Sequence, residues 1–427
     1  MTEHPTVTAL HPADRDRVAA AALVAELFTS AEVRGDPYPL YRRLRELDPV
    51  HVTDAGRLYL TRYADCNAVL RHPDLVVQSP EWMDRASPDW RQSPGLVQNI
   101  ESVLFRDPPV HTRLRRLVNK SFSARRVAKM REDVGRLVER ALDRLAEEGS
   151  DGSPVNLYSM LAHTLPIAVV GTLIGIPEAD WDLLHDPVSS VMQVVEVGVS
   201  PAVLAQADDS ARMLNAYFED LIEQRRREPR QDIISDLIAT SQTAGDPGEG
   251  GAGMSETELL RMVILLFGAG VDTTVGLLSN GAVALLEHPR QADLLLARPE
   301  LAPGAVDEIL RYDSPTHIVV RVTARDTELA GRAVPAGRMV VGITGAAHRD
   351  PEQFEDPDVF DITRSGSSVL SFSGGIHYCV GAPLARMEAE IFFPRLLARF
   401  PALALAGTPE RRGYVVRGYT SLPVTVK

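Results

Sequence analysis

Cysteine is almost absent from this chain, which has two, Cys66 and Cys379, among its 427 residues. So few cysteines exclude a disulfide-stapled scaffold and fit a reducing compartment. A zinc site is a poor alternative, because Cys379 has only His377 near it and Cys66 has no His or Cys at ligand spacing. A lone cysteine is most often a buried structural thiol, so a functional Cys379 needs support from other segments.

Lysine is also scarce and occurs only at Lys120, Lys129 and Lys427, so arginine carries nearly all the positive charge. The net charge of −13 argues against nucleic acid as a partner. We find no apolar run of the ~18 residues that a membrane-spanning helix needs, and no signal-peptide pattern at the N-terminus. These absences predict a cytoplasmic protein that does not contact a membrane.

Linkers are missing as well, apart from a Gly-rich stretch at residues 244–253. A hydrophobic share of 44% is sufficient for one large core. The sequence therefore predicts a loose lead-in over residues 1–33 and a single, mainly α domain with small β-sheets over residues 34–427. Helices are expected at 36–47, 63–71, from 107, and at 125–147, 158–174, 178–194, 203–228, 231–242, 255–287 and 383–400. Strands are expected at 50–61, 314–330, 340–343 and 414–426, and residues 80–104 are expected to be an irregular functional loop.

The segment around Cys379 is rich in glycine. It reads Phe372-Ser373-Gly374-Gly375-Ile376-His377-Tyr378-Cys379-Val380-Gly381, and Ala382-Pro383 then begins a helix. Glycine lets a backbone approach a flat molecule and direct N–H groups at a sulfur. A cysteine just before a helix N-terminus lies in a positive field that favours its thiolate. A thiolate in such a loop is a suitable fifth ligand for haem iron.

A second signal lies in the long apolar helix expected from Ser255 to Glu287. Its centre contains Gly268-Ala269-Gly270, followed by Asp272 and Thr273. A glycine in mid-helix costs roughly 1 kcal/mol relative to alanine, so either a flat molecule lies on this turn or another helix crosses it closely. An acid beside a hydroxyl at such a turn is suited to proton delivery.

Two further pairs say little by themselves. Glu308 and Arg311 share a helix face, as do His111 and Arg115. Surface ion pairs like the first are common and weak, and the second pair is usually part of a solvated basic face. His111 and Arg115 also have the charge needed to bind carboxylates.

Four ordered motifs carry a resemblance to a known family. They are Ala-Gly-x-Asp-Thr-Thr at 269–274, Glu-x-x-Arg at 308–311, Arg-Asp-Pro…Phe…Asp-Pro…Phe-Asp at 349–361, and Phe-x-x-Gly-x-His-x-Cys-x-Gly at 372–381. Together they resemble bacterial soluble cytochromes P450 over the chain from Asp36 to Val426. The resemblance implies a triangular, helix-rich fold with haem b between the long central helix and the helix after the cysteine loop.

The resemblance also implies roles for individual residues. Cys379 is the thiolate ligand of the haem iron, and Phe372 packs beside its sulfur. The other implied haem contacts are His111, Arg115, Ala269, Gly270, Arg321, Gly375, His377 and Gly381. Asp272 and Thr273 are the acid and alcohol that deliver protons, and Glu308 with Arg311 forms an internal ion pair behind the haem.

Pocket and partner residues follow from the same resemblance. The implied substrate contacts are Leu265, Gly268, Ala269, Thr316, His317, Val319, Val415 and Val416, with the stretches 80–104 and 191–199. Most are aliphatic, which predicts a medium-sized hydrophobic substrate, and Asn99, Gln193 and His317 are available to bind a polar group; core packing explains each of them about as well. Arg113, Arg116, Lys120 and Arg386 form a candidate docking patch for an acidic ferredoxin or flavodoxin, with an ordinary charged helix face as the alternative.

Three positions depart from the usual pattern of the family. Ser373 stands where glycine is usual, Val369 where histidine is common, and His348 where asparagine is common. None of the three removes a ligand or a proton donor, although serine at 373 is expected to alter the loop slightly.

The implied activity is that of a monomeric monooxygenase. It uses O2 and two electrons from its redox partner to hydroxylate or epoxidise its substrate, as relatives do in secondary-metabolite biosynthesis. Oxidative ring closure or coupling without oxygen insertion is the alternative within the same chemistry. A haem-thiolate sensor or binding protein without turnover is the alternative of another class, and the intact Asp272–Thr273 pair argues against it.

Overall fold

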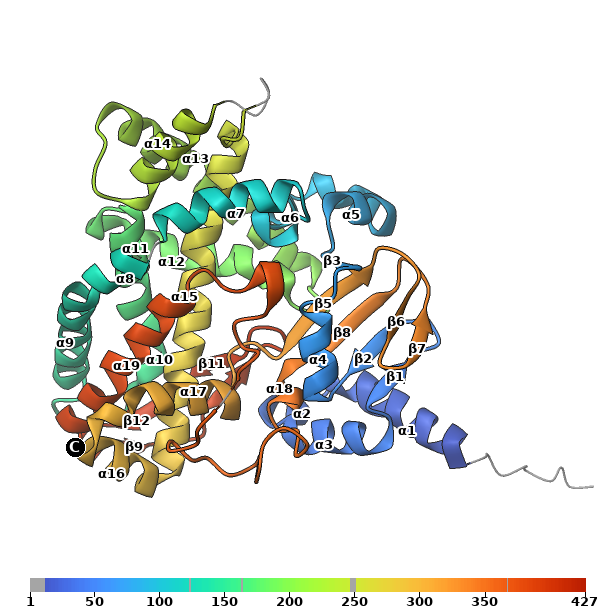
Figure 1. Cartoon of the computed structure of the whole chain (residues 1–427). Coiled ribbons are helices and arrows are strands. Elements are labelled where there is room, and N and C mark those ends of the chain that lie inside the picture. The colour runs from blue at the N-terminus through green and yellow to red at the C-terminus, as the bar shows by residue number, and fades with distance from the viewer. Residues whose placement is uncertain (1–11, 123, 163, 246–250, 367) are drawn as a thin grey trace, which may run out of the picture.

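The computed structural model describes residues 12–122, 124–162, 164–245, 251–366 and 368–427 (Figure 1). Its α-helices are α1 Pro12–Leu27, α2 Ala31–Gly35, α3 Tyr38–Leu47, α4 Tyr63–Val69, α5 Pro80–Ala86, α6 Pro94–Ile100, α7 Val110–Ser121, α8 Ala124–Lys129, α9 Arg131–Glu148, α10 Leu157–Ala162, α11 Leu165–Ile174, α12 Trp181–Met192, α13 Pro201–Arg227, α14 Ile233–Ala244, α15 Glu256–Glu287, α16 Pro289–Ala297, α17 Ala302–Tyr312, α18 Thr344–Ala347 and α19 Ala382–Arg399. Short 3-10 helices lie at Pro88–Gln92 (η1), Val103–Phe105 (η2), Glu178–Asp180 (η3), Gln193–Val195 (η4), Pro299–Leu301 (η6) and Gly375–His377 (η7).

The strands form several small sheets in different parts of the molecule (Figure 1). They are β1 Val50–Val52, β2 Leu58–Leu60, β3 Leu75–Val76, β4 Val155–Asn156, β5 Ile318–Thr323, β6 Thr327–Leu329, β7 Arg332–Val334, β8 Met339–Ile343, β9 Ala404–Leu405, β10 Glu410–Arg412, β11 Gly418–Ser421 and β12 Pro423–Thr425. The largest sheet has the order β1-β2-β8-β5-β3, in which β2 and β8 are parallel and the other neighbours are antiparallel. β4, β12 and β9 form a second sheet, and β10–β11 and β6–β7 form hairpins.

The helix α15 runs through the middle of the molecule, with the helical bundle on one side and the largest sheet on the other (Figure 1). It begins with the expected capping box, in which the Ser255 hydroxyl accepts the N–H of Glu258 and the Glu258 carboxylate accepts the N–H of Ser255. α11, α12, α13 and α19 pack around it. Because nearly all of its length is covered, α15 can be apolar on every face.

Two segments have the length and mean hydropathy of a membrane-spanning helix, although neither is a continuous apolar run. The helix α15 and the stretch Leu157–Ile174 are each long and apolar enough to cross a membrane by composition alone. However, 83% and 75% of their apolar windows are buried inside the fold. Burial in the protein core accounts for their apolar character.

Residues 12–27 form the 16-residue helix α1, where the sequence indicated a loose lead-in. Ala20, Val24 and Leu27 are buried in one cluster with Leu44 of α3. These buried positions have the spacing i, i+4, i+7 of a helix face. The signal was missed because the stretch is rich in alanine, which reduces the contrast between the buried and the exposed face.

Residues 80–104 are also more regular than expected. α5, η1 and α6 each begin with a Ser-Pro pair, at Ser79, Ser87 and Ser93, and the hydroxyls of Ser79 and Ser93 accept N–H groups of the first turn. Serine at the cap followed by proline at the first position is a helix-start signal. Trp90 of η1 is buried, and Trp82 of α5 is half-buried.

Candidate active site

The cysteine loop is closed by its own backbone. The N–H of Cys379 donates to the carbonyl oxygen of Phe372 at 2.9 Å, and the N–H groups of Gly381 and Ala382 hydrogen-bond the sulfur. Phe372 is buried, with the Arg386 guanidinium 5.0 Å from its ring centroid. Cys379 is exposed as a residue although protein atoms surround and desolvate its sulfur, so the loop presents the sulfur from a lined recess to a ligand.

The sequence predicted that the positive field at the helix N-terminus favours the thiolate form of Cys379, and the structure shows an opposing effect. Desolvation raises the pKa of the Cys379 thiol, and the N–H groups of Gly381 and Ala382 with the Arg115 guanidinium oppose this effect only in part. The thiolate-favouring field that the sequence indicated is therefore present but does not dominate. A coordinated metal cation reverses this balance, because it deprotonates a thiol outright.

The middle of α15 has one open turn. Ala269 is exposed although it lies within a buried helix, and Gly270 and Thr273 are half-buried. The Thr273 hydroxyl donates to the carbonyl oxygen of Ala269 at 2.7 Å. α19, which follows the cysteine loop, packs against α15, so the open turn and the Cys379 sulfur belong to neighbouring elements.

The two glycines beside Ala269 serve helix packing. A Cβ on Gly268 would lie 2.8 Å from Val188 and 3.0 Å from Met192, both on α12, and one on Gly270 would lie 2.7 Å from Val170 of α11. Close helix crossing thus explains both glycines. Gly268, predicted to line the substrate pocket, therefore faces Val188 and Met192 of α12, whereas Ala269 is open.

Asp272 lies in a buried polar cluster that the sequence did not reveal. Its Oδ1 accepts the Ser189 hydroxyl at 2.6 Å and lies 3.3 Å from Nη2 of Arg412. Ser189 is on α12 and Arg412 ends β10. No periodicity could have paired these residues with Asp272, because they are distant in the chain.

The residues expected to bind propionates gather at one place. The rings of His111 and His377 have their centroids 4.3 Å apart, and Arg115 donates to the carbonyl oxygen of Tyr378 at 2.5 Å. Burial lowers the pKa of His377 to about 3, with further lowering by Arg321, His111 and Arg115. Burial and Arg115 likewise lower the pKa of His111.

This basic cluster has unused hydrogen-bonding atoms. Among the described residues, Nδ1 of His111 and Nε2 of His377 are buried without a partner. Orphaned imidazole nitrogens beside two guanidinium groups fit a ligand with two carboxylates. The donor set and the sulfur of Cys379 together fit haem b, whose two propionates would lie on this cluster.

Glu308 and Arg311 form the expected ion pair, and it is fully buried. Arg311 also donates to the carbonyl oxygens of His348, Pro357 and Val359. Glu308 accepts the N–H of Asp361 at 2.8 Å and pairs with Arg364 at 3.3 Å. The pair therefore holds α17 against the segment 348–364 that precedes the cysteine loop.

The predicted pocket residues divide into two groups. His317 is buried in a polar cluster, with Tyr41 Oη 3.1 Å from its Nδ1 and Tyr38 Oη 3.4 Å from its Nε2. Both ring nitrogens of His317, a predicted substrate contact, therefore have partners within the protein. Leu265 is buried, and Thr316, Val319, Val415 and Val416 are half-buried. The Thr316 hydroxyl donates to the carbonyl oxygen of Ser371 at 2.9 Å, which joins it to the cysteine loop.

The predicted docking patch is only partly available. Arg113 is paired with the Glu258 carboxylate at 2.5 Å, and Arg386 is paired with Asp307. Both ion pairs are partly exposed, so Arg113 and Arg386 lie at the surface with their charges already matched by a carboxylate. Arg116 and Lys120 are exposed on α7. Ile376 and Tyr378 of the cysteine loop are also exposed, at 53% and 44%.

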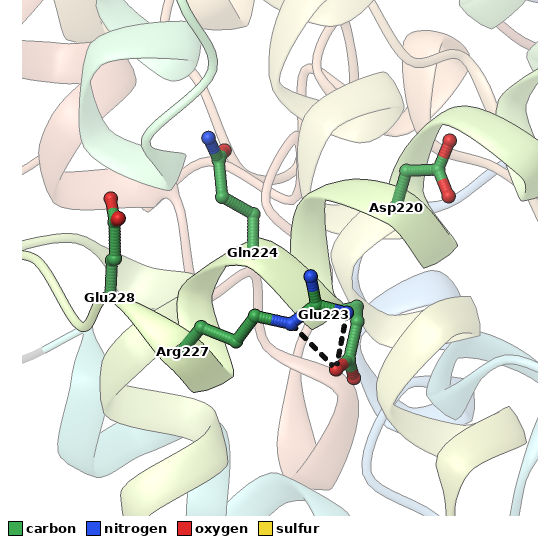
Figure 2. Close-up of a pocket in the computed structure, with 5 residues that line it drawn as sticks. All are labelled: Asp220, Glu223, Gln224, Arg227 and Glu228. Atoms are coloured by element: carbon green, nitrogen blue, oxygen red, sulfur yellow. Dashed lines mark hydrogen bonds and ion pairs between the residues drawn. The ribbon is translucent and has the colours of Figure 1, made fainter.

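A hollow of about 350 Å³ lies at the C-terminal end of α13. Figure 2 shows its lining of Asp220, Glu223, Gln224, Arg227 and Glu228, with Arg227 hydrogen-bonded to Glu223. The lining is polar and contains none of the residues predicted for haem or substrate. It is therefore separate from the site around Cys379.

Comparison with known proteins decides the family, since a model of the cytochrome P450 family matches residues 66–297 and 295–412. The chain belongs to the cytochrome P450 family. It is 40% identical over 401 residues to a vitamin D(3) 25-hydroxylase of Pseudonocardia autotrophica, covering 92% of this chain and 94% of that protein. The P450BioI structure, solved with an acyl carrier protein carrying hexadec-9Z-enoic acid, aligns with a TM-score of 0.83 at 34% identity, covering 93% of this chain and 100% of the other. CxnD, a P450 for C–S bond formation in chuangxinmycin biosynthesis, aligns with a TM-score of 0.82 at 31% identity, covering 94% and 96%.

Family membership confirms several predictions from the sequence. This P450 binds haem b and is an oxidoreductase of the monooxygenase class. The helix-rich fold with small sheets is confirmed by the solved structures. The structure adds Ser189 and Arg412 around Asp272.

Proposed function

We propose that this P450 hydroxylates or epoxidises a medium-sized hydrophobic molecule in bacterial secondary metabolism. Cys379 is the iron ligand in this proposal, and haem b bound there supplies the oxygen-activating chemistry. His111, Arg115, Arg321 and His377 hold its propionates. The observation that carries the proposal is the orphaned pair of buried imidazole nitrogens beside the sulfur of Cys379, an exposed residue.

The proton-delivery roles of Asp272 and Thr273 rest on their geometry. Thr273 lies on the open turn and keeps its hydroxyl bonded to the carbonyl oxygen of Ala269. Asp272, the next residue, contacts Ser189 and Arg412. An acid held by charged and polar partners beside an alcohol can pass protons inward while apolar side chains exclude bulk water.

A polar group on the substrate is part of the proposal. Asn99 is buried, and its amide donates to the carbonyl oxygens of Gly95 and Val191 at 3.1 and 3.0 Å. Both amide hydrogens are thus used, and Oδ1 has no partner among the described residues. A hydrogen-bond donor on the substrate would satisfy this acceptor.

The proposed electron donor is a ferredoxin or flavodoxin. Arg116 and Lys120 supply positive charge on an acidic protein, and Ile376 and Tyr378 supply apolar surface next to Cys379. A small complementary patch suits a transient electron-transfer complex. We propose that the enzyme acts as a monomer in the cytoplasm.

A screen of compounds for low-to-high-spin shifts of the haem spectrum tests the proposal. Substrates found in this way are incubated with NADPH and a surrogate ferredoxin system, and the products are analysed by mass spectrometry. A gain of one oxygen atom is the expected result. Spin shifts without NADPH consumption would support a haem-thiolate sensor and contradict the proposal.

Oxidative ring closure or coupling is the second candidate. The similarity to CxnD, which serves C–S bond formation, is the observation that favours it. Oxidative coupling starts from the same cofactor and needs the same proton delivery as hydroxylation. The residues described above therefore do not distinguish the two reactions. A product that has lost two hydrogens without gaining oxygen would identify it.

A further inference from the structure

The connection between α12 and α13 is fastened to a turn near the C-terminus by one carboxylate. Glu196, directly after η4, accepts the N–H of Tyr414 at 2.9 Å, of Val415 at 3.1 Å and of Val416 at 2.7 Å. Three successive amides that converge on one anion form a compact anion site, and such charge-assisted hydrogen bonds are strong. Glu196 therefore fixes the position of this turn.

The same turn begins with the cation that contacts the proton-delivery acid. Arg412 is two residues before Tyr414, and its Nη2 lies 3.3 Å from Oδ1 of Asp272. Between them, Gly413 has a φ of 75°, and a Cβ there would collide with the carbonyl oxygen of Val416. The turn is thus tightly wound, and a shift of its amides moves the backbone of Arg412.

The charges of Arg412 and Asp272 strengthen the contact between the turn and α15. Desolvation acts to lower the pKa of Arg412, but Asp272, Tyr158 and Glu196 outweigh it and raise the pKa, so Arg412 remains a cation. The guanidinium is largely buried, at 20% exposure, and Asp272 at 8%. Asp272 is also bound by Ser189 of α12, the helix that leads into the Glu196 segment.

We propose that Glu196 and Arg412 are positioning residues. They couple the position of Asp272 to the contact between the α12–α13 connection and the turn at residues 412–416, and the connection is called seated when Glu196 makes this contact. When the connection is seated, Glu196 holds the turn and Arg412 holds Asp272. When the connection lifts, the turn loses three hydrogen bonds and Asp272 loses its fixed cation. Proton delivery is then restricted to the seated state. This inference rests on the proposed function of Asp272.

Amide hydrogen exchange of the haem-loaded resting protein tests the link without turnover. Asp272→Asn removes the charge that holds Arg412, and the Asp272 carboxylate bonds Ser189 and Arg412 while the amides of residues 414–416 bond Glu196. Because coupling is reciprocal, exchange at Tyr414, Val415 and Val416 is expected to accelerate several-fold in Asp272→Asn, and at least about 10-fold in Glu196→Ala, since an opening equilibrium shifts tenfold for each 1.4 kcal/mol lost. Glu410→Gln, an exposed carboxylate on the same hairpin, is the control and should leave exchange unchanged. Unchanged exchange in Asp272→Asn would overturn the link.

Coupling of electrons to product tests the positioning role. Glu196→Ala and Arg412→Gln are each expected to raise the share of NADPH released as hydrogen peroxide several-fold, and Arg412→Lys should restore part of the coupling. The double variant should match the larger single effect, because both changes break one link. The positioning role would be refuted if the effects of the two substitutions on peroxide release multiplied in the double variant. It would also be refuted if amide exchange accelerated in the single variants while their peroxide release stayed unchanged. A wild type that consumes no NADPH would count against the proposed function, and the exchange data would still decide the link.

Discussion

Arg311 donates two hydrogen bonds of 2.7 Å to the carboxylate of Glu308, and neither side chain has exposed surface. The guanidinium also reaches three carbonyl oxygens of the segment 348–359. Only a planar fork with several donors can satisfy all of these groups at once.

Arg311→Lys is therefore expected to destabilise the protein strongly, by about 3 kcal/mol, because a buried carboxylate loses its bidentate partner. Urea unfolding at neutral pH measures the loss. Arg298→Lys is the matched control, since Arg298 pairs with exposed Glu300, and it should unfold like the wild type. Equal effects of the two substitutions would show that burial does not matter here.

Replacement of Cys379 should abolish the spectrum of a haem thiolate. Cys379→Ala is expected to remove the red-shifted Soret band of the ferrous–CO complex, because no other described cysteine is exposed. Cys66→Ala is the control, since the Cys66 thiol is buried and lies 3.4 Å from the carbonyl oxygen of Leu60. A normal band in Cys379→Ala would refute the ligand assignment.

Thr273→Ala should bind substrate with normal affinity but release more hydrogen peroxide per NADPH. The substitution removes the hydroxyl that bonds the Ala269 carbonyl oxygen on the open turn, and with it one carrier of the proton path. Thr273→Ser keeps the hydroxyl and should stay coupled. If Thr273→Ala forms product as efficiently as the wild type, Thr273 does not carry protons.

His377→Ala is expected to weaken haem retention by about tenfold or more, the value of one charge-assisted hydrogen bond. The reason is the orphaned Nε2, which a propionate would satisfy. Haem retention is measured as the rate at which the protein loses haem to an excess of apo-globin. His72→Ala provides the comparison, since His72 bonds the N–H of Asp74 outside the basic cluster. Identical loss rates for both variants would exclude a propionate contact at His377.

His348→Asn should make stability less sensitive to acid. Burial, with Arg311 and Arg349, lowers the pKa of His348 from its ordinary 6.5 to about 3. The folded protein therefore keeps this ring neutral while the unfolded chain protonates it, so the stability it contributes is complete above pH 6.5 and falls toward pH 3. At pH 5 the loss is about 2 kcal/mol.

Asparagine at 348 can still accept the N–H of Leu370, which His348 Nε2 accepts at 2.8 Å. The variant should therefore lose less stability than the wild type between pH 7 and pH 5 in urea unfolding. The same loss in both proteins would mean that His348 is protonated in the folded state.

Motifs with local geometry were predictable from the sequence. The capping box of α15, the Glu308–Arg311 pair and the cysteine loop depend on residues a few positions apart, and each appeared as expected. Ser373, which stands where glycine is usual, does adopt the left-handed conformation, with a φ of 63°. Serine tolerates this conformation at a cost, so the departure noticed in the sequence is a real strain.

Contacts between distant segments were not predictable. Ser189 and Arg412 reach Asp272 from α12 and from the end of β10, and Tyr38 and Tyr41 occupy both nitrogens of His317. Charge alone also did not reveal that Arg113 and Arg386 pair with Glu258 and Asp307. Pairing of this kind depends on tertiary packing, and the periodicity of a sequence carries no information about it.

The helices α1 and α2 have a consequence for anyone who shortens this chain. Arg34 donates to the Tyr414 hydroxyl at 2.9 Å, and Arg417 donates to the carbonyl oxygens of Arg34 and Gly35. Trimming the protein to the predicted domain start at residue 34 would leave Arg34 and Gly35 without the rest of α2, the helix that positions them against the turn held by Glu196. The truncated enzyme would then still bind haem but release more of the electrons from NADPH as hydrogen peroxide. The cause would lie at the N-terminus, far in the sequence from the residues that deliver protons.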